Sequence, residues 1–78
     1  ERGASVLPVG VTGAEGRFSS GDVVNVVSAD GALLGRGITR YSSEDIGRVH
    51  GLRLDVIARF MPEKDGQPVI HRDELLVF

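Results

Sequence analysis

Residues 22–41 read DVVNVVSADGALLGRGITRY, and this stretch predicts the centre of the fold. The run 22–28 is rich in β-branched residues and ends in turn residues, which is typical of a β-strand. Asp30-Gly31 is a strong hairpin signal, because glycine readily adopts the positive φ that a tight turn requires. Residues 33–41 then form the returning strand. The stretch therefore predicts an antiparallel hairpin with its turn at 29–32.

The returning strand has glycines on one side and arginines on the other. Gly35 and Gly37 face the same side, and glycine in a strand often marks a bulge or a close approach of another backbone. Arg36 and Arg40 share the opposite side, followed by Tyr41. Arginine beside an aromatic ring can bind phosphate and stack on a base. The alternative is a solvated strand face with ion pairs to nearby Glu44 and Asp45, and the sequence leaves both interpretations open.

The hairpin is preceded by GRFSSGDV, residues 16–23, which almost matches a phosphate-binding loop. Gly16 and Gly21 have the glycine spacing of the G-x-x-x-x-G-K-[ST] pattern. Asp22 stands where the pattern needs lysine, and Val23 stands where it needs a hydroxyl for Mg²⁺. Because a carboxylate repels phosphate, we interpret Gly21-Asp22 as a turn into the strand, with Asp22 accepting backbone N–H bonds.

Further from the hairpin, the sequence predicts shorter extended segments. Residues 5–11 are apolar but contain Pro8, which favours an edge strand or an extended entry, and 12–21 form a glycine-rich connection. Residues 69–72 and 75–78 are expected to be short closing strands. Together with the hairpin they give an expected four to six short strands.

Two short helices are expected between the hairpin and the closing strands. Ser42 can cap the first, with Asp45 three residues later in a capping-box-like position. The second is expected over about 53–60, and Pro62 stops it. Its apolar residues recur at helical spacing on one face, namely Leu54, Ile57, Ala58 and Met61. The fold class expected is therefore mainly β with small helices (α+β), arranged as a compact, mostly antiparallel barrel.

Composition limits the classes of function. The chain has 78 residues, enough for one small domain, and it has no cysteine for disulfides or thiolate metal sites. No apolar run approaches the ~20 residues of a membrane span. The net charge of −2 differs from the basic balance typical of domains that bind nucleic acid through its backbone, although eight of the nine basic residues are arginine. The chain begins with Glu1, so we expect a domain from a longer protein.

The sequence predicts no catalytic residue and no metal site. His71-Arg72-Asp73 resembles the H-R-D motif of protein kinases, but Phe78 occupies the position of the asparagine that holds Mg²⁺. The only histidines are His50 and His71, and a zinc site needs three or four ligands. Four serines lie in turn and cap contexts, where hydroxyls bond to backbone groups, namely Ser19, Ser20, Ser42 and Ser43.

Three sequence motifs together resemble the PUA domain family. They are LPVGV at 7–11, F-x-x-G-D-x-V from Phe18 to Val24, and the glycine pair Gly31 and Gly37. Further stretches, RYSS at 40–43 and VIHRD at 69–73, are similar to the C-terminal PUA domain of the bacterial glutamate 5-kinase family. The resemblance implies a pseudo-barrel of short mixed strands with one or two small helices over residues 1–78. It also implies structural turn roles for Gly21, Asp22, Gly31 and Gly37.

The same resemblance implies a parent enzyme that phosphorylates the γ-carboxylate of L-glutamate, the first step of proline biosynthesis in the cytoplasm. ATP and Mg²⁺ would then bind a separate amino-acid-kinase domain, N-terminal to this segment and absent from it. No cofactor and no catalysis are expected in residues 1–78. We expect a regulatory or structural domain whose partners are that kinase domain and the other subunits of an oligomer.

RNA binding is the alternative, because other PUA domains bind RNA. The residues that would form an RNA or partner surface are Arg17, Arg36, Arg40, Tyr41 and Arg72. The acidic balance of the chain argues against a surface that binds RNA through charge alone.

Overall fold

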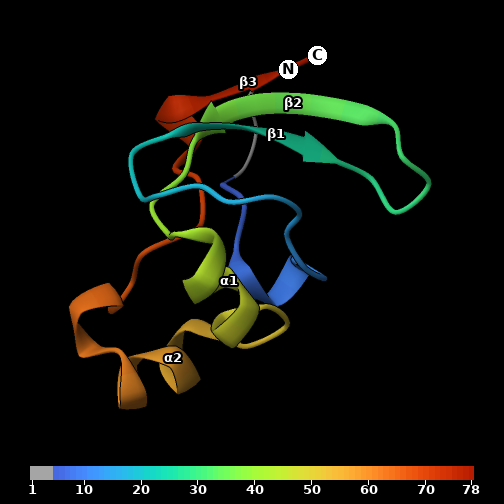
Figure 1. Cartoon of the computed structure of the whole chain (residues 1–78). Coiled ribbons are helices and arrows are strands. Elements are labelled where there is room, and N and C mark those ends of the chain that lie inside the picture. Colours follow the sequence, from blue (N-terminus) through green and yellow to red (C-terminus); the bar gives the residue numbers. More distant parts are fainter. Residues whose placement is uncertain (1–4) are drawn as a thin grey trace.

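The hairpin predicted from residues 22–41 forms the centre of an antiparallel sheet. The computed structural model describes residues 5–78. The sheet has the order β1-β2-β3, from β1 (Val23–Val27), β2 (Leu33–Ile38) and β3 (Leu75–Val77). Two helices, α1 (Ser43–Val49) and α2 (Leu54–Phe60), lie on one side of this sheet (Figure 1). The predicted α+β class is confirmed, and the strands described pair antiparallel, in agreement with the expected mostly antiparallel arrangement.

The turn between β1 and β2 is one residue longer than a two-residue hairpin loop. The Ser28 amide donates to the carbonyl of Ala32 at 2.8 Å, and the Gly31 amide donates back to the carbonyl of Ser28 at 3.0 Å. Gly31 has a φ of 92°, which glycine adopts without strain. The register shifts between Val26 and Val27, so a bulge accompanies this turn. The predicted hairpin is confirmed, but β2 ends at Ile38 and the next residues turn toward the core.

The two strand glycines lie where another backbone crosses β2. A Cβ built on Gly37 would come within 2.7 Å of the Glu74 carbonyl oxygen and 2.8 Å of Ile70 Cγ2. A Cβ on Gly35 would lie 2.5 Å from the carbonyl oxygen of Leu76. The close approach predicted from the sequence is therefore confirmed. These two glycines let residues 70–76 lie directly against the inner side of the hairpin.

The expected terminal strands are shorter than predicted. Val6 and Ile70 form one isolated antiparallel bridge, and a 3₁₀ turn at Pro8–Gly10 ends the extended entry. Pro8 starts this turn because its ring fixes φ and removes an amide donor. Residues 69–72 also do not form a strand. The chain instead makes a 3₁₀ turn over Arg72–Glu74 before β3 begins.

The start of α1 and both ends of α2 lie close to the predicted positions. Ser42 Oγ accepts a hydrogen bond from the Asp45 amide at 3.1 Å, which caps α1 as expected. The helix α2 ends at Phe60, two residues before Pro62, and a 3₁₀ turn over Pro62–Lys64 follows. Short helices of this kind depend on packing for most of their stability.

The core fills the space between the sheet and the helices. Its buried hydrophobic residues are Tyr41, Ile46, Val49, Ile57, Met61, Val69 and Ile70. Phe18 and Val24, expected in the core, are partly buried against this cluster. Among residues 5–78, Thr39 is the buried polar residue, and its hydroxyl donates to the Tyr41 carbonyl at 2.8 Å. Its hydrogen bond satisfies a polar group that would otherwise be costly to bury.

The stretch GRFSSGDV forms the predicted turn. Asp22 Oδ2 accepts the Ser19 amide at 2.9 Å, and the Asp22 amide donates to the Ser19 carbonyl at 3.1 Å. Gly21 has a φ of 98°, and its amide donates to the carbonyl of Thr39 at 2.7 Å. The turn therefore closes on itself and is joined to the residue that follows β2.

The glycine contacts give a first prediction. Gly37→Ala is expected to lower the free energy of unfolding by about 1–3 kcal/mol, because the new methyl group overpacks against backbone that cannot move aside. Gly47→Ala is the matched control, since Gly47 lies in α1 with nothing within 4 Å of its added Cβ. That control is expected to gain about 0.5–1 kcal/mol from helix propensity. Urea denaturation measures both, and equal changes of the same sign would contradict the close approach.

The Asp22 turn gives a second prediction. Asp22→Ala is expected to lower the free energy of unfolding by about 1 kcal/mol, because the Ser19 amide loses its acceptor. Asp22→Asn keeps an oxygen in the same place and is expected to retain most of that stability. Thermal melts of the two variants and the parent chain check this. A melt of Asp22→Ala that matches the parent would show that the bond adds no stability.

Candidate functional site

Of the predicted surface residues, Tyr41 lies in the core. It is 0% exposed, and its hydroxyl donates to the carbonyl of Gln67 at 2.9 Å. Burial raises its pKa, and the negative charge of Asp45 adds to this shift. The expectation that Tyr41 could stack on a base is therefore wrong, because β2 ends at Ile38 and the chain then turns inward.

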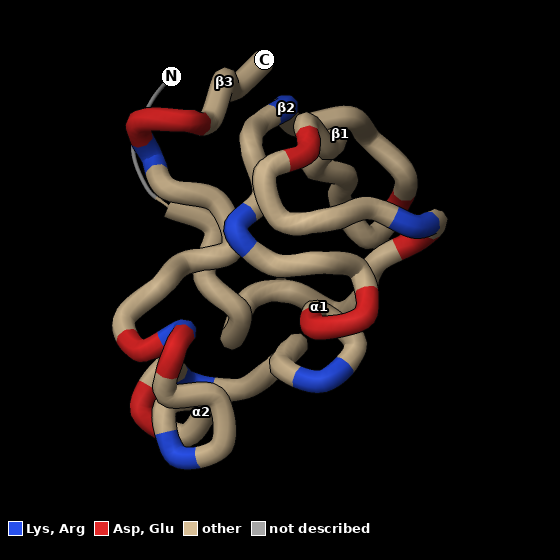
Figure 2. Tube along the Cα trace, turned by 60° about the vertical axis from the view of Figure 1, so that its left-hand side comes forward, with Lys and Arg blue, Asp and Glu red and all other residues tan. Residues whose placement is uncertain are grey.

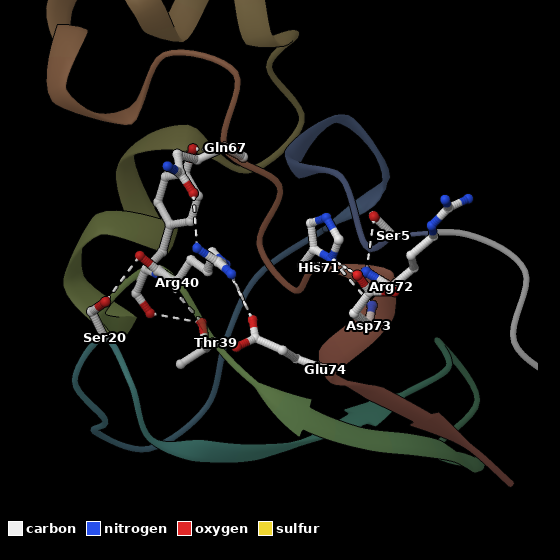
Figure 3. Close-up of polar contacts among 10 residues, drawn as sticks. Ser5, Ser20, Thr39, Arg40, Gln67, His71, Arg72, Asp73 and Glu74 are labelled. Atoms are coloured by element: carbon white, nitrogen blue, oxygen red, sulfur yellow. Dashed lines mark hydrogen bonds and ion pairs between the residues drawn. The ribbon is translucent and has the colours of Figure 1, made fainter.

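The side chain of Arg40 is engaged by an acidic partner within the chain. Its Nη2 lies 2.9 Å from Glu74 Oε1, and its Nε donates to the same oxygen at 3.2 Å (Figure 3). A longer contact of 3.5 Å joins Nη1 to Gln67 Oε1. The sequence left open ion pairs with Glu44 and Asp45, but the partner is Glu74, which precedes β3.

The backbone of Arg40 is equally occupied. Its amide donates to the Val69 carbonyl at 2.7 Å, and its carbonyl accepts from Lys64 Nζ at 2.6 Å and Ser20 Oγ at 3.1 Å (Figure 3 shows the Ser20 contact). Segments distant in sequence therefore meet at this residue. Arg40 acts as a structural clamp, and its charge is partly satisfied inside the domain.

Arg36 remains on the surface, in the middle of the sheet. Its Nε donates to Asn25 Oδ1 on β1 at 3.0 Å, and its guanidinium carbon lies 5.8 Å from the centre of the Phe78 ring. Within residues 5–78, no carboxylate lies within ion-pair distance of Arg36. Asn25 and Phe78 orient this arginine, and no opposite charge among the described residues pairs with it.

The other two arginines lie on segments away from the sheet. Arg17 lines a surface depression beside the Ser19–Asp22 turn, together with Asp22 and Glu44. Arg72 is exposed on the 3₁₀ turn before β3, where its amide donates to Ser5 Oγ at 3.0 Å. The structure thus does not gather the predicted arginines into one cluster with an aromatic ring.

The His71-Arg72-Asp73 sequence makes a turn. His71 Nδ1 accepts the Asp73 amide at 3.1 Å and lies 3.5 Å from Asp73 Oδ2 (Figure 3). Among residues 5–78, no three histidine or acidic side chains gather as a metal-ligand set. Basic and acidic positions are interspersed along the trace in Figure 2. In the part of the chain that the structure describes, no helix has the length and apolar character needed to cross a membrane.

The sheet also has an apolar surface that was not predicted from the sequence, and we call it the outer sheet face. Its side chains point away from the helices, and six of them are exposed and hydrophobic: Val23, Val27, Leu34, Ile38, Leu76 and Phe78. Asn25 and Arg36 are the polar residues of this face. The signal was present in VVNVV, which has valine on both faces of β1, a pattern of strands covered on both sides.

The comparison with protein families identifies the class. The PUA domain family model matches residues 1–61, so the chain belongs to the PUA domain family. Its curated relatives are glutamate 5-kinases. The chain is 43% identical over 77 residues to glutamate 5-kinase of Syntrophus aciditrophicus, covering 99% of this chain and 20% of that protein.

Two other relatives agree in name and extent. Glutamate 5-kinase 2 of Pseudoalteromonas translucida is 38% identical over 76 residues, which is 97% of this chain and 21% of that protein. Glutamate 5-kinase of Thermotoga maritima is 43% identical over 75 residues, which is 96% of this chain and 21% of that protein. The chain therefore spans about a fifth of the length of the curated relatives it matches.

Proposed function

We propose that this chain is the non-catalytic PUA domain of a glutamate 5-kinase and acts through contacts with the rest of that enzyme. The observation that carries the proposal is the 38–43% identity to these kinases over 96–99% of the chain. In this proposal the parent transfers phosphate from ATP to the γ-carboxylate of L-glutamate in the cytoplasm, for proline biosynthesis. ATP and Mg²⁺ bind its amino-acid-kinase domain. The domain described above has a regulatory or structural role.

The arrangement of the polar residues in the described chain supports a non-catalytic role. The stretch that comes nearest to a phosphate loop is closed by Asp22 on the Ser19 amide, and the depression beside it carries two carboxylates. Such a surface disfavours phosphate. His71 Nδ1 accepts the Asp73 amide, and among residues 5–78 no hydrogen bond joins the His71 ring to a serine hydroxyl, as activation of a serine nucleophile would require.

A truncation experiment tests the proposal. The natural full-length protein is expected to consume ATP in a glutamate-dependent way, and the segment 1–78 alone is expected to consume none. A variant lacking this segment is expected to keep catalytic turnover, because the reacting groups lie elsewhere. A deletion variant that still binds ATP and melts cooperatively, yet has no turnover, would show that this domain supplies a catalytic group. Absence of glutamate-dependent turnover in the full-length protein would contradict the proposal that the parent is a glutamate 5-kinase.

RNA binding is the second candidate, supported by the exposed Arg17, Arg36 and Arg72. It is tested by fluorescence titration of residues 1–78 with a structured RNA at low salt. Since the arginines lie on separate segments and the net charge is −2, we expect weak binding that disappears at physiological salt. Tight binding that Arg36→Ala and Arg72→Ala both weaken, with Arg59→Ala on α2 as the control, would favour RNA.

A further inference from the structure

We propose that the outer sheet face is the surface on which the preceding domain of the same polypeptide packs. The inference rests on the proposed function, in which this segment follows a larger kinase domain. The helices cover the opposite side of the sheet and leave this face open (Figure 1). The proposal assigns one partner to it, and that partner is covalently attached.

The apolar character of the face is unusual for a surface exposed to water. Val23 and Leu76 are each 63% exposed, and Phe78 is 59% exposed. The pairing brings these side chains together, since Val23 is opposite Ile38 and Arg36 is opposite Leu76. Soluble monomers rarely expose contiguous apolar patches of more than a few hundred Å², and larger ones mark interaction sites.

Arg36 defines the chemistry of the partner. It lies in the middle of the face with its guanidinium oriented by Asn25 and Phe78, and no described carboxylate pairs with it. An apolar surface of the partner that carries one aspartate or glutamate would satisfy this charge on contact. Arginine is common in protein interfaces, because its planar fork can donate to both oxygens of a carboxylate.

The occupant is inferred from the extent of chain outside the structure and from the point where the chain enters. The relatives are about five times as long as this chain, so about four fifths of such a protein lies outside it. The described chain enters at Ser5 and Val6, which bond to Arg72 and Ile70 just before β3. The described chain therefore begins on the β3 side of the sheet, next to the segment that leads into the strand that carries Leu76.

Because the two domains are covalently attached, an apolar patch of moderate area is sufficient for them to dock. A tethered partner has an effective concentration in the millimolar range for short linkers, so docking needs less contact area than association of free molecules. A second copy of this chain would lack that advantage. The tether favours the preceding domain over a second copy.

Cysteine labelling in the natural full-length protein tests the proposal. The segment has no cysteine, so a single new thiol reports one position, and mass spectrometry of its peptide separates it from thiols elsewhere. Val27→Cys lies on the face and Val9→Cys lies on the Pro8–Gly10 turn, and the two valines are equally exposed at 53%. Leu76→Cys on the face, where Leu76 is 63% exposed, is compared with Phe60→Cys on α2, where Phe60 is 44% exposed, so exposure alone would make the thiol on the face react faster.

The two thiols on the face are expected to react at least about tenfold more slowly than the two control thiols, because docked side chains react only when the domains separate. Equal reaction rates at all four positions, whether fast or slow, would overturn the proposal, because docking protects only the two positions on the face. Slow reaction on the face that is lost on dilution to nanomolar protein would assign the face to a second copy and also overturn it.

Glutamate-dependent ATP turnover is measured on the same samples, so the two proposals fail separately. Turnover together with fast labelling of the face would support the proposed parent enzyme and contradict the docking surface. Protection without turnover supports docking to a preceding domain and contradicts the glutamate 5-kinase as the parent.

Discussion

The structure depends on a close approach of backbone at Gly35 and Gly37. Because neither residue has a Cβ, the segment 70–76 can lie 2.5–2.8 Å from where those methyl groups would be. Val24 and Val26 of β1 face the same side and pack on the core from the neighbouring strand. The hairpin, the closing strand and the buried Ile70 are thereby held together without a disulfide, which a chain lacking cysteine cannot form.

Arg40 shows how a small domain uses a charged residue for architecture. Residues 39–41 leave the sheet and pass into the core, where Thr39 and Tyr41 are fully buried. Arg40 lies between them with its side chain directed to Glu74, at 2.9 Å, and its carbonyl bonded to Lys64 and Ser20. These contacts bring residues far apart in the sequence to one point. Partly exposed ion pairs contribute little by themselves, so the clamp depends mainly on its backbone bonds and on the buried neighbours.

The sheet gives the domain two different faces. One face covers the buried hydrophobic core, and the other exposes valine, leucine, isoleucine and phenylalanine around Arg36. A chain of this size buries only a modest share of its apolar surface by itself. Apolar residues that stay exposed on the sheet are therefore consistent with a domain that packs against another domain. This agrees with membership in a family whose matched relatives here are about five times as long.

Local chemistry in the sequence determined the hairpin, the Ser42 cap, the end of α2 before Pro62 and the Asp22 turn, because each depends on residues close together in the chain. The sequence also indicated the close approach at Gly37, since glycine weakens a strand and is favoured there where a neighbouring backbone leaves no room for a side chain. Only the tertiary structure decided that Tyr41 is buried, that Arg40 pairs with Glu74 rather than Glu44, and that residues 69–72 form a bridge and a turn. Those outcomes depend on where β2 ends and which distant segment packs against it, and local patterns do not carry that information.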